Sequence, residues 1–324
     1  MSRGAELAEL EADTAFVHQT LLPTPQIAWP LLSARCGADV VVKHENHSPV
    51  GAFKLRGGLT YLRELRARTP AVAGVIAATR GNHGQSVAYA ARSFGIPATI
   101  VVPHGNSVEK NAAMRAHGAR LVEHGRDFQD AFLHAQALAK SADLHFVPSM
   151  HPWLVRGAST CAFELFRARP ELELVYVPIG LGSGICAALR ARDALGLSTR
   201  LVGVVADRAP TYALSFAAGR AVPTDSADTL ADGLAVRVPN EDALAAILAG
   251  VERIVRVSEA ELRAAMRALF SDTHNAAEGA GAAALAACLK EPAEVAGRSV
   301  GVLLTGGNVD RELFAAVLAE KESS

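Results

Sequence analysis

The chain alternates short runs of consecutive apolar residues with longer, alanine-rich segments of helical character. The apolar runs that predict strands lie at 40–43, 74–78, 98–102, 121–123, 174–178, 200–205 and 300–304. Helices are expected between them, for example over 84–93, 107–117 and 128–141. Strands that are apolar throughout indicate a sheet covered by helices on both faces. We therefore predict an α/β fold with mostly parallel sheets.

Three of the predicted strands end directly in glycine-rich or polar turns. These turns are Thr79-Arg80-Gly81-Asn82, Gly180-Leu181-Gly182-Ser183-Gly184 and Thr305-Gly306-Gly307-Asn308. In open α/β sheets, ligands bind beyond the carboxyl ends of the strands. A chain of 324 residues is long enough for two domains, so we expect the three turns to converge on one crevice between them.

The composition is that of a globular protein that binds a small molecule. Lys and Arg number 32 against 33 Asp and Glu, so no net charge favours nucleic acid or anionic lipid. No apolar run is long enough to span a bilayer and no signal core lies at the N-terminus, so a cytoplasmic location is expected. The four cysteines form no CxxC pair, so neither a zinc site nor a disulfide framework is predicted.

The segment from His47 to Gly58 contains the most promising nucleophile, Lys54. This lysine follows Phe53 directly and stands between a loop marked by Gly and Pro and a run of helix formers. An amine becomes a nucleophile when it loses its proton, and apolar and cationic neighbours such as Phe53 and Arg56 favour that loss. An ordinary solvated lysine is the alternative, and the rest of the chain has to decide between the two.

The loop Gly180–Gly184 follows a predicted strand and precedes a predicted helix. Glycines let backbone N–H groups approach an anion, and a helix N-terminus adds a favourable dipole, so phosphate is the natural ligand. An ordinary strand-to-helix turn is the alternative. A dinucleotide fingerprint is disfavoured because Ile185 stands where a third Gly or Ala is needed, and the chain has no GxxxxGK[ST] segment.

The other two turns also offer groups that can bind a ligand. The turn from Thr79 to Gln85 provides backbone donors, an amide and a guanidinium, which suit a carboxylate or a phenolic oxygen. Alternatively, Asn82 serves only to cap its own helix. The hydroxyl of Thr305 can meet a ring nitrogen as a neutral partner, or it can cap the turn into the next helix.

Together these segments resemble the fold-type-II pyridoxal-phosphate enzymes, specifically the threonine/serine dehydratase and serine racemase family. The resemblance lies in the order of four motifs, which are Phe53-Lys54-Leu55-Arg56-Gly57, Gly81-Asn82-His83-Gly84-Gln85, Gly180–Gly184 and Thr305-Gly306-Gly307-Asn308. Weaker agreement occurs at 231–236 and 278–282, and the resemblance covers nearly the whole chain. It implies a two-domain, tryptophan synthase β-like fold with parallel sheets flanked by helices. The large cofactor-binding domain would comprise residues 1–50 and 148–324, and the small domain residues 51–147.

The resemblance implies pyridoxal 5'-phosphate as the cofactor and gives roles to single residues. The catalytic residue would be Lys54, which would carry the cofactor covalently and remove the α-proton of the substrate. The other cofactor-binding residues would be Phe53 against the ring, Asn82 at the phenolic oxygen, the backbone of Gly180, Leu181, Gly182, Ser183 and Gly184 around the phosphate, and Thr305 at the pyridine nitrogen. The substrate carboxylate would bind at the turn that contains Thr79, Arg80, Gly81, His83 and Gln85.

The sequence departs from the family at positions that bear on the substrate. Ala52 stands where serine is common, and Arg80 replaces the serine that acts as the second acid/base in serine racemases, so racemisation is not expected as the main activity. Arg80 can instead pair with the substrate carboxylate, with a second acidic or bulky group, or with a local carboxylate. The family's divalent-metal site would fall at Val205 and Thr211, so no metal is expected. A regulatory domain does not fit after Asn308, so feedback inhibition by isoleucine is not expected.

We therefore predict a lyase, a dehydratase or ammonia-lyase that converts a β-hydroxy amino acid to a 2-oxo acid and ammonia. L-Threonine and L-serine are the leading substrates. Phenylserine, hydroxyaspartate or a hydroxyectoine-derived acid is the alternative that Arg80 motivates, and a non-catalytic protein that binds the cofactor or an amino acid is an alternative of another class. The expected partners are the small-molecule substrate and a second copy of the chain in a homodimer, with no nucleic acid or membrane.

Overall fold

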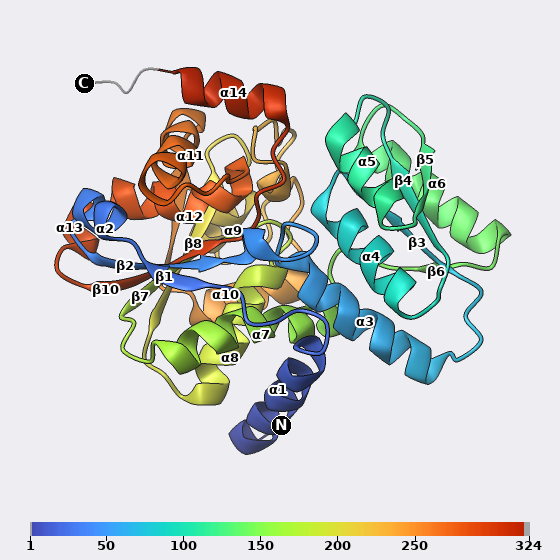
Figure 1. Cartoon of the computed structure of the whole chain (residues 1–324), viewed down its shortest axis with the longest axis horizontal. Coiled ribbons are helices and arrows are strands. Elements are labelled where there is room, and N and C mark those ends of the chain that lie inside the picture. Colours follow the sequence, from blue (N-terminus) through green and yellow to red (C-terminus); the bar gives the residue numbers. More distant parts are fainter. Residues whose placement is uncertain (1, 321–324) are drawn as a thin grey trace.

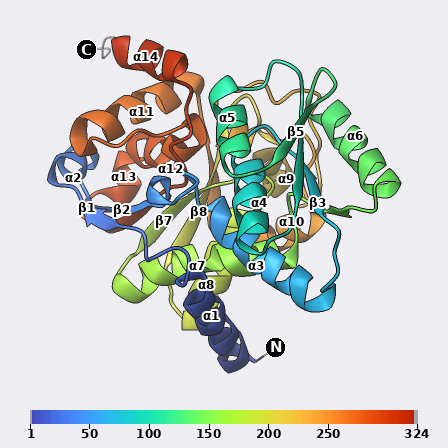
Figure 2. The same cartoon turned by 45° about the vertical axis from the view of Figure 1, so that its right-hand side comes forward.

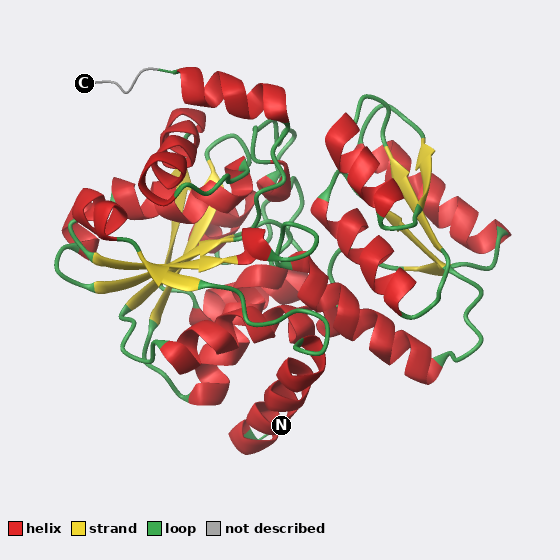
Figure 3. Ribbon diagram, viewed as in Figure 1, coloured by secondary structure: helices red, strands yellow, loops and turns green. Residues whose placement is uncertain are grey.

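The computed structural model describes residues 2–320 and contains two separate sheets (Figures 1 and 3). The larger sheet has the order β1-β2-β10-β7-β8-β9 and is parallel except for its edge strand β1. Its strands are β1 (Gln26–Ala28), β2 (Asp39–His44), β10 (Ser299–Leu304), β7 (Leu174–Pro178), β8 (Arg200–Ala206) and β9 (Arg253–Val257). The smaller sheet is parallel, in the order β5-β4-β3-β6; its strands are β5 (Arg120–Glu123), β4 (Ala98–Val102), β3 (Val75–Ala78) and β6 (His145–Phe146).

Both faces of the larger sheet are buried beneath helices. Val40 and Val42 of β2 pack into one apolar cluster with α2, α11 and α12, while Val41 packs into a second cluster with α1, α7, α8 and α10. Because successive strand residues point to opposite faces, an all-apolar strand supplies both clusters. The helices around this sheet are α1 (Arg3–Val17), α2 (Pro30–Cys36), α7 (Pro152–Ala168), α8 (Ser183–Leu195), α9 (Thr211–Ala218), α10 (Glu241–Gly250), α11 (Glu259–Thr273), α12 (Gly279–Lys290), α13 (Pro292–Val295) and α14 (Arg311–Ala319).

The smaller sheet repeats this arrangement. Val75 and Ala77 of β3 pack toward α3, α4 and α5, and Ile76 and Ala78 pack toward α6. Figure 2 shows α4 and α5 in front of the sheet and α6 at its outer side. The helices are α3 (Lys54–Arg68), α4 (Asn82–Ser93), α5 (Val108–Ala116) and α6 (Phe128–Ser141), and two short 3₁₀ segments are η1 (Glu45–His47) and η2 (Asp232–Leu234). None of the helices within residues 2–320 is long and apolar enough to cross a membrane.

The predicted α/β fold with parallel sheets is confirmed. All seven predicted strands occur within one residue of their expected ends, and the three named helices within two. The sequence pattern missed β1, β6 and β9. The first two are only three and two residues long, and β9 carries an arginine at two of its five positions, so none shows an apolar run. The smaller sheet falls inside 51–147, and the exact domain boundaries stay a prediction.

Candidate active site

Lys54 lies at the first position of α3 and reaches across to the start of α8. Its Nζ donates a hydrogen bond to Ser183 Oγ at 2.9 Å and lies 4.8 Å from the centroid of the Phe53 ring. Burial lowers the pKa of Lys54 from 10.5 to about 8, although the negative charge of Glu278 acts in the opposite direction. The amine is therefore much easier to deprotonate than a solvated lysine.

Backbone contacts fix the segment before Lys54 against the turn that follows β10. Phe53 N–H donates to the carbonyl of Thr305 at 3.0 Å, and Gly307 N–H donates to the carbonyl of Gly51 at 2.9 Å. Gly51 adopts a left-handed φ of +64°, and an added Cβ would lie only 2.6 Å from a side-chain oxygen of Asn308. The lysine segment and the Thr305 turn, which lie some 250 residues apart in the sequence, therefore form one unit.

The glycine loop between β7 and α8 leaves no room for a side chain at Gly180 or Gly182. A Cβ at Gly180 would lie 2.2 Å from the carbonyl oxygen of Gly233, and Gly182 has a φ of +103°. Tyr212 supports the loop, because its hydroxyl donates to the carbonyl of Leu181 at 2.9 Å. The loop ends at the N-terminus of α8, where unpaired N–H groups and the helix dipole favour an anion.

The turn from β3 into α4 presents several unpaired donors. Thr79 Oγ1 accepts hydrogen bonds from the N–H groups of Gly81 at 3.0 Å and Gly84 at 3.3 Å. Among the hydrogen bonds of residues 2–320, the backbone N–H groups of Asn82 and His83 have no acceptor, and the buried Nε2 atoms of His83 and Gln85 have no partner. The two backbone N–H groups and the side-chain amide of Gln85 suit the carboxylate of a small molecule.

His83 is held neutral at this turn. Burial, with the positive charge of Lys54 as a second cause, lowers its pKa to about 4. Its side chain lines a cavity with Lys54, Ser183 and Phe53, and a neighbouring cavity is lined by Phe53, Gly184 and Thr305. A neutral imidazole beside the lysine can donate or accept a hydrogen bond without adding charge.

Asn82 bridges the two sheets through its side chain. Its Nδ2 donates to Glu278 Oε1 at 2.6 Å, and its Oδ1 accepts from Asn308 Nδ2 at 2.7 Å. Burial raises the pKa of Glu278, and nearby Lys110 and the hydrogen bond from Asn82 act against that rise. Glu278 and Asn308, which lie in the part of the molecule that contains the larger sheet, therefore hold the amide of Asn82 in one orientation.

Arg80 is the exposed member of the same turn. Its Nη2 lies 3.6 Å from Asp232 Oδ1, and the second oxygen of Asp232 accepts a 3.0 Å hydrogen bond from Lys110 Nζ. The local carboxylate that the sequence left open as a partner for Arg80 is therefore Asp232. The contact uses one guanidinium nitrogen at a long distance, and 51% of the Arg80 side chain remains exposed.

The structure thus brings together Lys54, Phe53, the glycine loop, Asn82 and Thr305 at the facing ends of the two sheets. The profile of the family described as pyridoxal-phosphate dependent enzymes matches residues 17–306. The chain belongs to this family. Its cofactor is pyridoxal 5'-phosphate, as the predicted resemblance implied.

Relatives within the pyridoxal-phosphate family cover nearly the whole chain. An L-threonine ammonia-lyase of Thermotoga maritima is 33% identical over 303 residues, which are 93% of this chain and 74% of that protein. An L-threo-3-hydroxyaspartate ammonia-lyase of a Pseudomonas species is 34% identical over 296 residues, with 91% and 92% covered. The solved structure of threonine deaminase isoform 2 from Solanum lycopersicum superposes with a TM-score of 0.90 at 28% identity, covering 98% of this chain and 94% of that one.

Several residues in this family member's site were not given a role from the sequence. Glu278, Asp232 and Asn308 lie in segments that matched the family, yet their contacts depend on how distant turns meet. Lys110 had no signal beyond its place in a predicted helix. Glu278 stands directly before an alanine- and glycine-rich buried helix, and this position was the only sequence feature that could have indicated its role.

Proposed function

We propose that Lys54 carries pyridoxal 5'-phosphate and that the surrounding turns hold the rest of it. The residues fit the group: the glycine loop and the N-terminus of α8 offer N–H donors to a phosphate. Phe53 and Thr305 line the adjoining cavity, where a ring can lie against the phenyl group and a hydroxyl can meet its nitrogen. The amide of Asn82 lies between Glu278 and Asn308, which holds it ready for the phenolic oxygen.

The chain's own groups then perform the proton transfers of an elimination. The bound cofactor supplies the electron sink that makes the α-proton of an amino acid removable. Lys54 Nζ, with its pKa lowered to about 8, accepts that proton, and Ser183 Oγ at 2.9 Å fixes the direction of the amine. The donors at the turn after β3 orient the substrate carboxylate, and the hydroxyl of Thr305 leaves the ring nitrogen without a charged partner.

The reaction that these groups support best is the dehydration and deamination of a β-hydroxy amino acid, with L-threonine or L-serine as substrate. The observation that carries this proposal is the contact of the deprotonatable Lys54 with Ser183 at the phosphate-binding end of α8. The names of the threonine ammonia-lyase and threonine deaminase relatives support the same substrate. A serine-type second acid/base is missing at position 80, which supports elimination over racemisation.

A second candidate substrate is a β-hydroxy amino acid with an additional carboxylate, such as 3-hydroxyaspartate. Arg80 favours it because most of its guanidinium donors are free and half of its side chain is exposed. Two relatives that cover more than nine-tenths of the chain are named as L-threo-3-hydroxyaspartate ammonia-lyases. Phenylserine and a hydroxyectoine-derived acid remain further members of the same class of substrate.

A substrate panel separates these alternatives. Ammonia and 2-oxo acid release are measured with L-threonine, L-serine, 3-hydroxyaspartate, phenylserine and a hydroxyectoine-derived acid, using the wild type, Arg80→Ser and Lys54→Ala. We expect Lys54→Ala to abolish turnover of every substrate. If Arg80 binds a second carboxylate of the substrate, Arg80→Ser should lower kcat/KM for 3-hydroxyaspartate by about 10- to 100-fold. The kcat/KM for threonine should stay within about threefold of the wild-type value. A cofactor-loaded protein that releases no 2-oxo acid from any of the five would refute the dehydratase.

We further propose a homodimer located in the cytoplasm, a large domain of residues 1–50 and 148–324, and a small domain of 51–147. No group of three or more His, Cys, Asp or Glu side chains that could hold a metal ion occurs within residues 2–320, and independence from metal stays a prediction. Size-exclusion chromatography with light scattering tests the dimer, and activity after treatment with a chelator tests the metal.

A further inference from the structure

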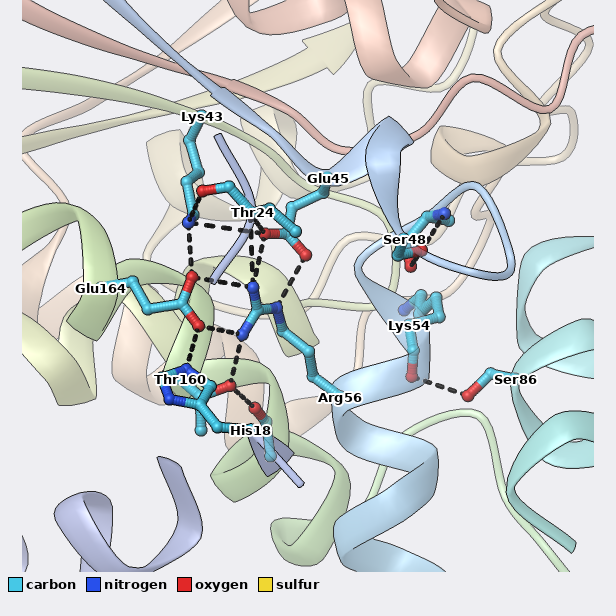
Figure 4. A network of polar contacts seen from close by, with 12 residues as sticks. His18, Thr24, Lys43, Glu45, Ser48, Lys54, Arg56, Ser86, Thr160 and Glu164 are labelled. Carbon is cyan, nitrogen blue, oxygen red and sulfur yellow. Dashed lines mark hydrogen bonds and ion pairs between the residues drawn. The ribbon is translucent and has the colours of Figure 1, made fainter. Parts of the chain in front are cut away.

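A buried network of charged residues lies directly behind the reactive lysine. Arg56 donates to both oxygens of Glu45, at 2.8 and 3.0 Å, and to both oxygens of Glu164, at 2.6 and 2.9 Å. Lys43 Nζ lies 2.5 Å from Glu164 and 4.0 Å from Glu45. The four side chains are at most 5% exposed and carry two positive and two negative charges. Figure 4 shows Arg56 between the two carboxylates, with Lys54 and Ser86 to one side.

Arg56 keeps Glu45 in its ionised form. Burial alone would raise the pKa of Glu45, but the positive charge of Arg56 and its hydrogen bonds outweigh burial and lower that pKa to about 2. Two threonines add further hydrogen bonds to the network. Thr24 Oγ1 donates to Glu45 at 2.6 Å, and Arg56 donates to Thr160 Oγ1 at 3.0 Å. Each carboxylate oxygen of Glu45 and Glu164 accepts at least one hydrogen bond, and a buried network connected in this way holds its members rigidly.

The network connects the start of α3 to the larger sheet. Glu45 follows β2, and Glu164 and Thr160 lie on α7, which packs on the larger sheet, while α3 packs against both α7 and α4 of the smaller sheet. Residues two apart on an α-helix point about 200° away from each other. When Arg56 is fixed in the network, Lys54 is therefore turned to the opposite side of the helix, toward Ser183.

We infer that Arg56 is a positioning residue for Lys54. It holds the lysine close to the larger sheet and its glycine loop, although α3 also packs against α4 of the smaller sheet. The network acts through geometry. It has no net charge, and the causes that shift the pKa of Lys54 are burial and Glu278, neither of which belongs to it. The inference rests on the cofactor of the family and not on which amino acid is the substrate.

The test uses cofactor-stripped protein reloaded with pyridoxal 5'-phosphate. In the covalent step, the neutral amine of Lys54 forms a C=N bond to the aldehyde carbon, and the aldehyde oxygen leaves as water with the two amine protons. Attachment is followed by visible absorbance and quantified on the Lys54 peptide by mass spectrometry after borohydride reduction. Pyridoxamine 5'-phosphate, which has the same ring and phosphate but no aldehyde, reports non-covalent binding separately.

Two variants and one matched control isolate the positioning effect. Arg56→Lys keeps the charge but loses the forked hydrogen bonds, and Thr160→Val removes one acceptor of Arg56 in a milder way. Thr273→Val is the control: Thr273 is also buried, donates to the carbonyl of residue 269 and accepts from Asn275. It lies on α11, and the hydrogen bonds of residues 2–320 link it to the lysine segment only through Asn275, which contacts Asn46 and His47 but not Arg56. Thermal unfolding shows whether Thr160→Val and Thr273→Val lose comparable stability.

We expect attachment to Lys54 to slow by about tenfold or more in Arg56→Lys and about threefold in Thr160→Val, and to be unchanged in Thr273→Val. In all three variants the pH midpoint of attachment should not move and the affinity for pyridoxamine 5'-phosphate should stay within about twofold of the wild type, because among residues 2–320 no hydrogen bond or ion pair joins the glycine loop to the network. If Thr273→Val slows attachment as much as Thr160→Val, or if both cofactor forms weaken equally, Arg56 has only a general structural role and the inference is wrong.

Discussion

Replacing Lys54 by methionine should stabilise the cofactor-free protein, and by an amount that depends on pH. The pKa of Lys54 falls from 10.5 to about 8 on folding, so the folded state binds its proton more weakly than the unfolded state does. The resulting penalty is fully present below about pH 8 and disappears above about pH 10.5. A pKa difference of about 2.5 corresponds to about 3 kcal/mol at neutral pH, part of which is screened because Lys54 keeps some exposure to solvent.

The assay is urea unfolding of the wild type and Lys54→Met at about pH 7 and about pH 9.5. Linkage makes the penalty about 2 kcal/mol smaller at the higher pH, or about 1 kcal/mol after screening, so the stabilising effect of Lys54→Met should shrink by that amount. Lys140→Met, which replaces an exposed lysine of α6, is the control and should show the same difference at both pH values. A Lys54→Met effect that is equal at both pH values would refute the lowered pKa.

Three further perturbations test the parts of the site. Gly180→Ala places a Cβ 2.2 Å from a backbone carbonyl oxygen, so its affinity for pyridoxamine 5'-phosphate, measured by titration calorimetry, should fall about tenfold or more. Glu278→Gln removes the carboxylate that raises the pKa of Lys54, so the pH midpoint for reductive methylation of Lys54 should move lower, and a move upward would contradict this assignment. Tyr212→Phe loses the hydrogen bond to the carbonyl of Leu181, so the free energy of unfolding should fall by about 1 kcal/mol.

The strands and the three turns that follow β3, β7 and β10 could be predicted from the sequence because each depends on local pattern. Val40–Val42 is apolar on both faces, which only a doubly covered sheet requires, and the glycines of 180–184 mark a turn with no room for a Cβ at Gly180 and Gly182. The partners of Asn82 could not be predicted. They depend on how the turn after β3 docks against Glu278, nearly 200 residues later, and hydrophobic periodicity carries no information about that orientation.

The contacts of the site fall into two kinds. Lys54 is tied to the larger sheet through the backbone of its own segment and through the buried network at Arg56. The turn after β3 reaches the other side through side chains: Asn82 contacts Glu278 and Asn308, and Arg80 forms a long, exposed pair with Asp232. Exposed pairs contribute little free energy, whereas buried networks resist disruption. The Arg80–Asp232 pair therefore adds little to the attachment of this turn, which depends mainly on the hydrogen bond from Asn82 to the buried carboxylate of Glu278.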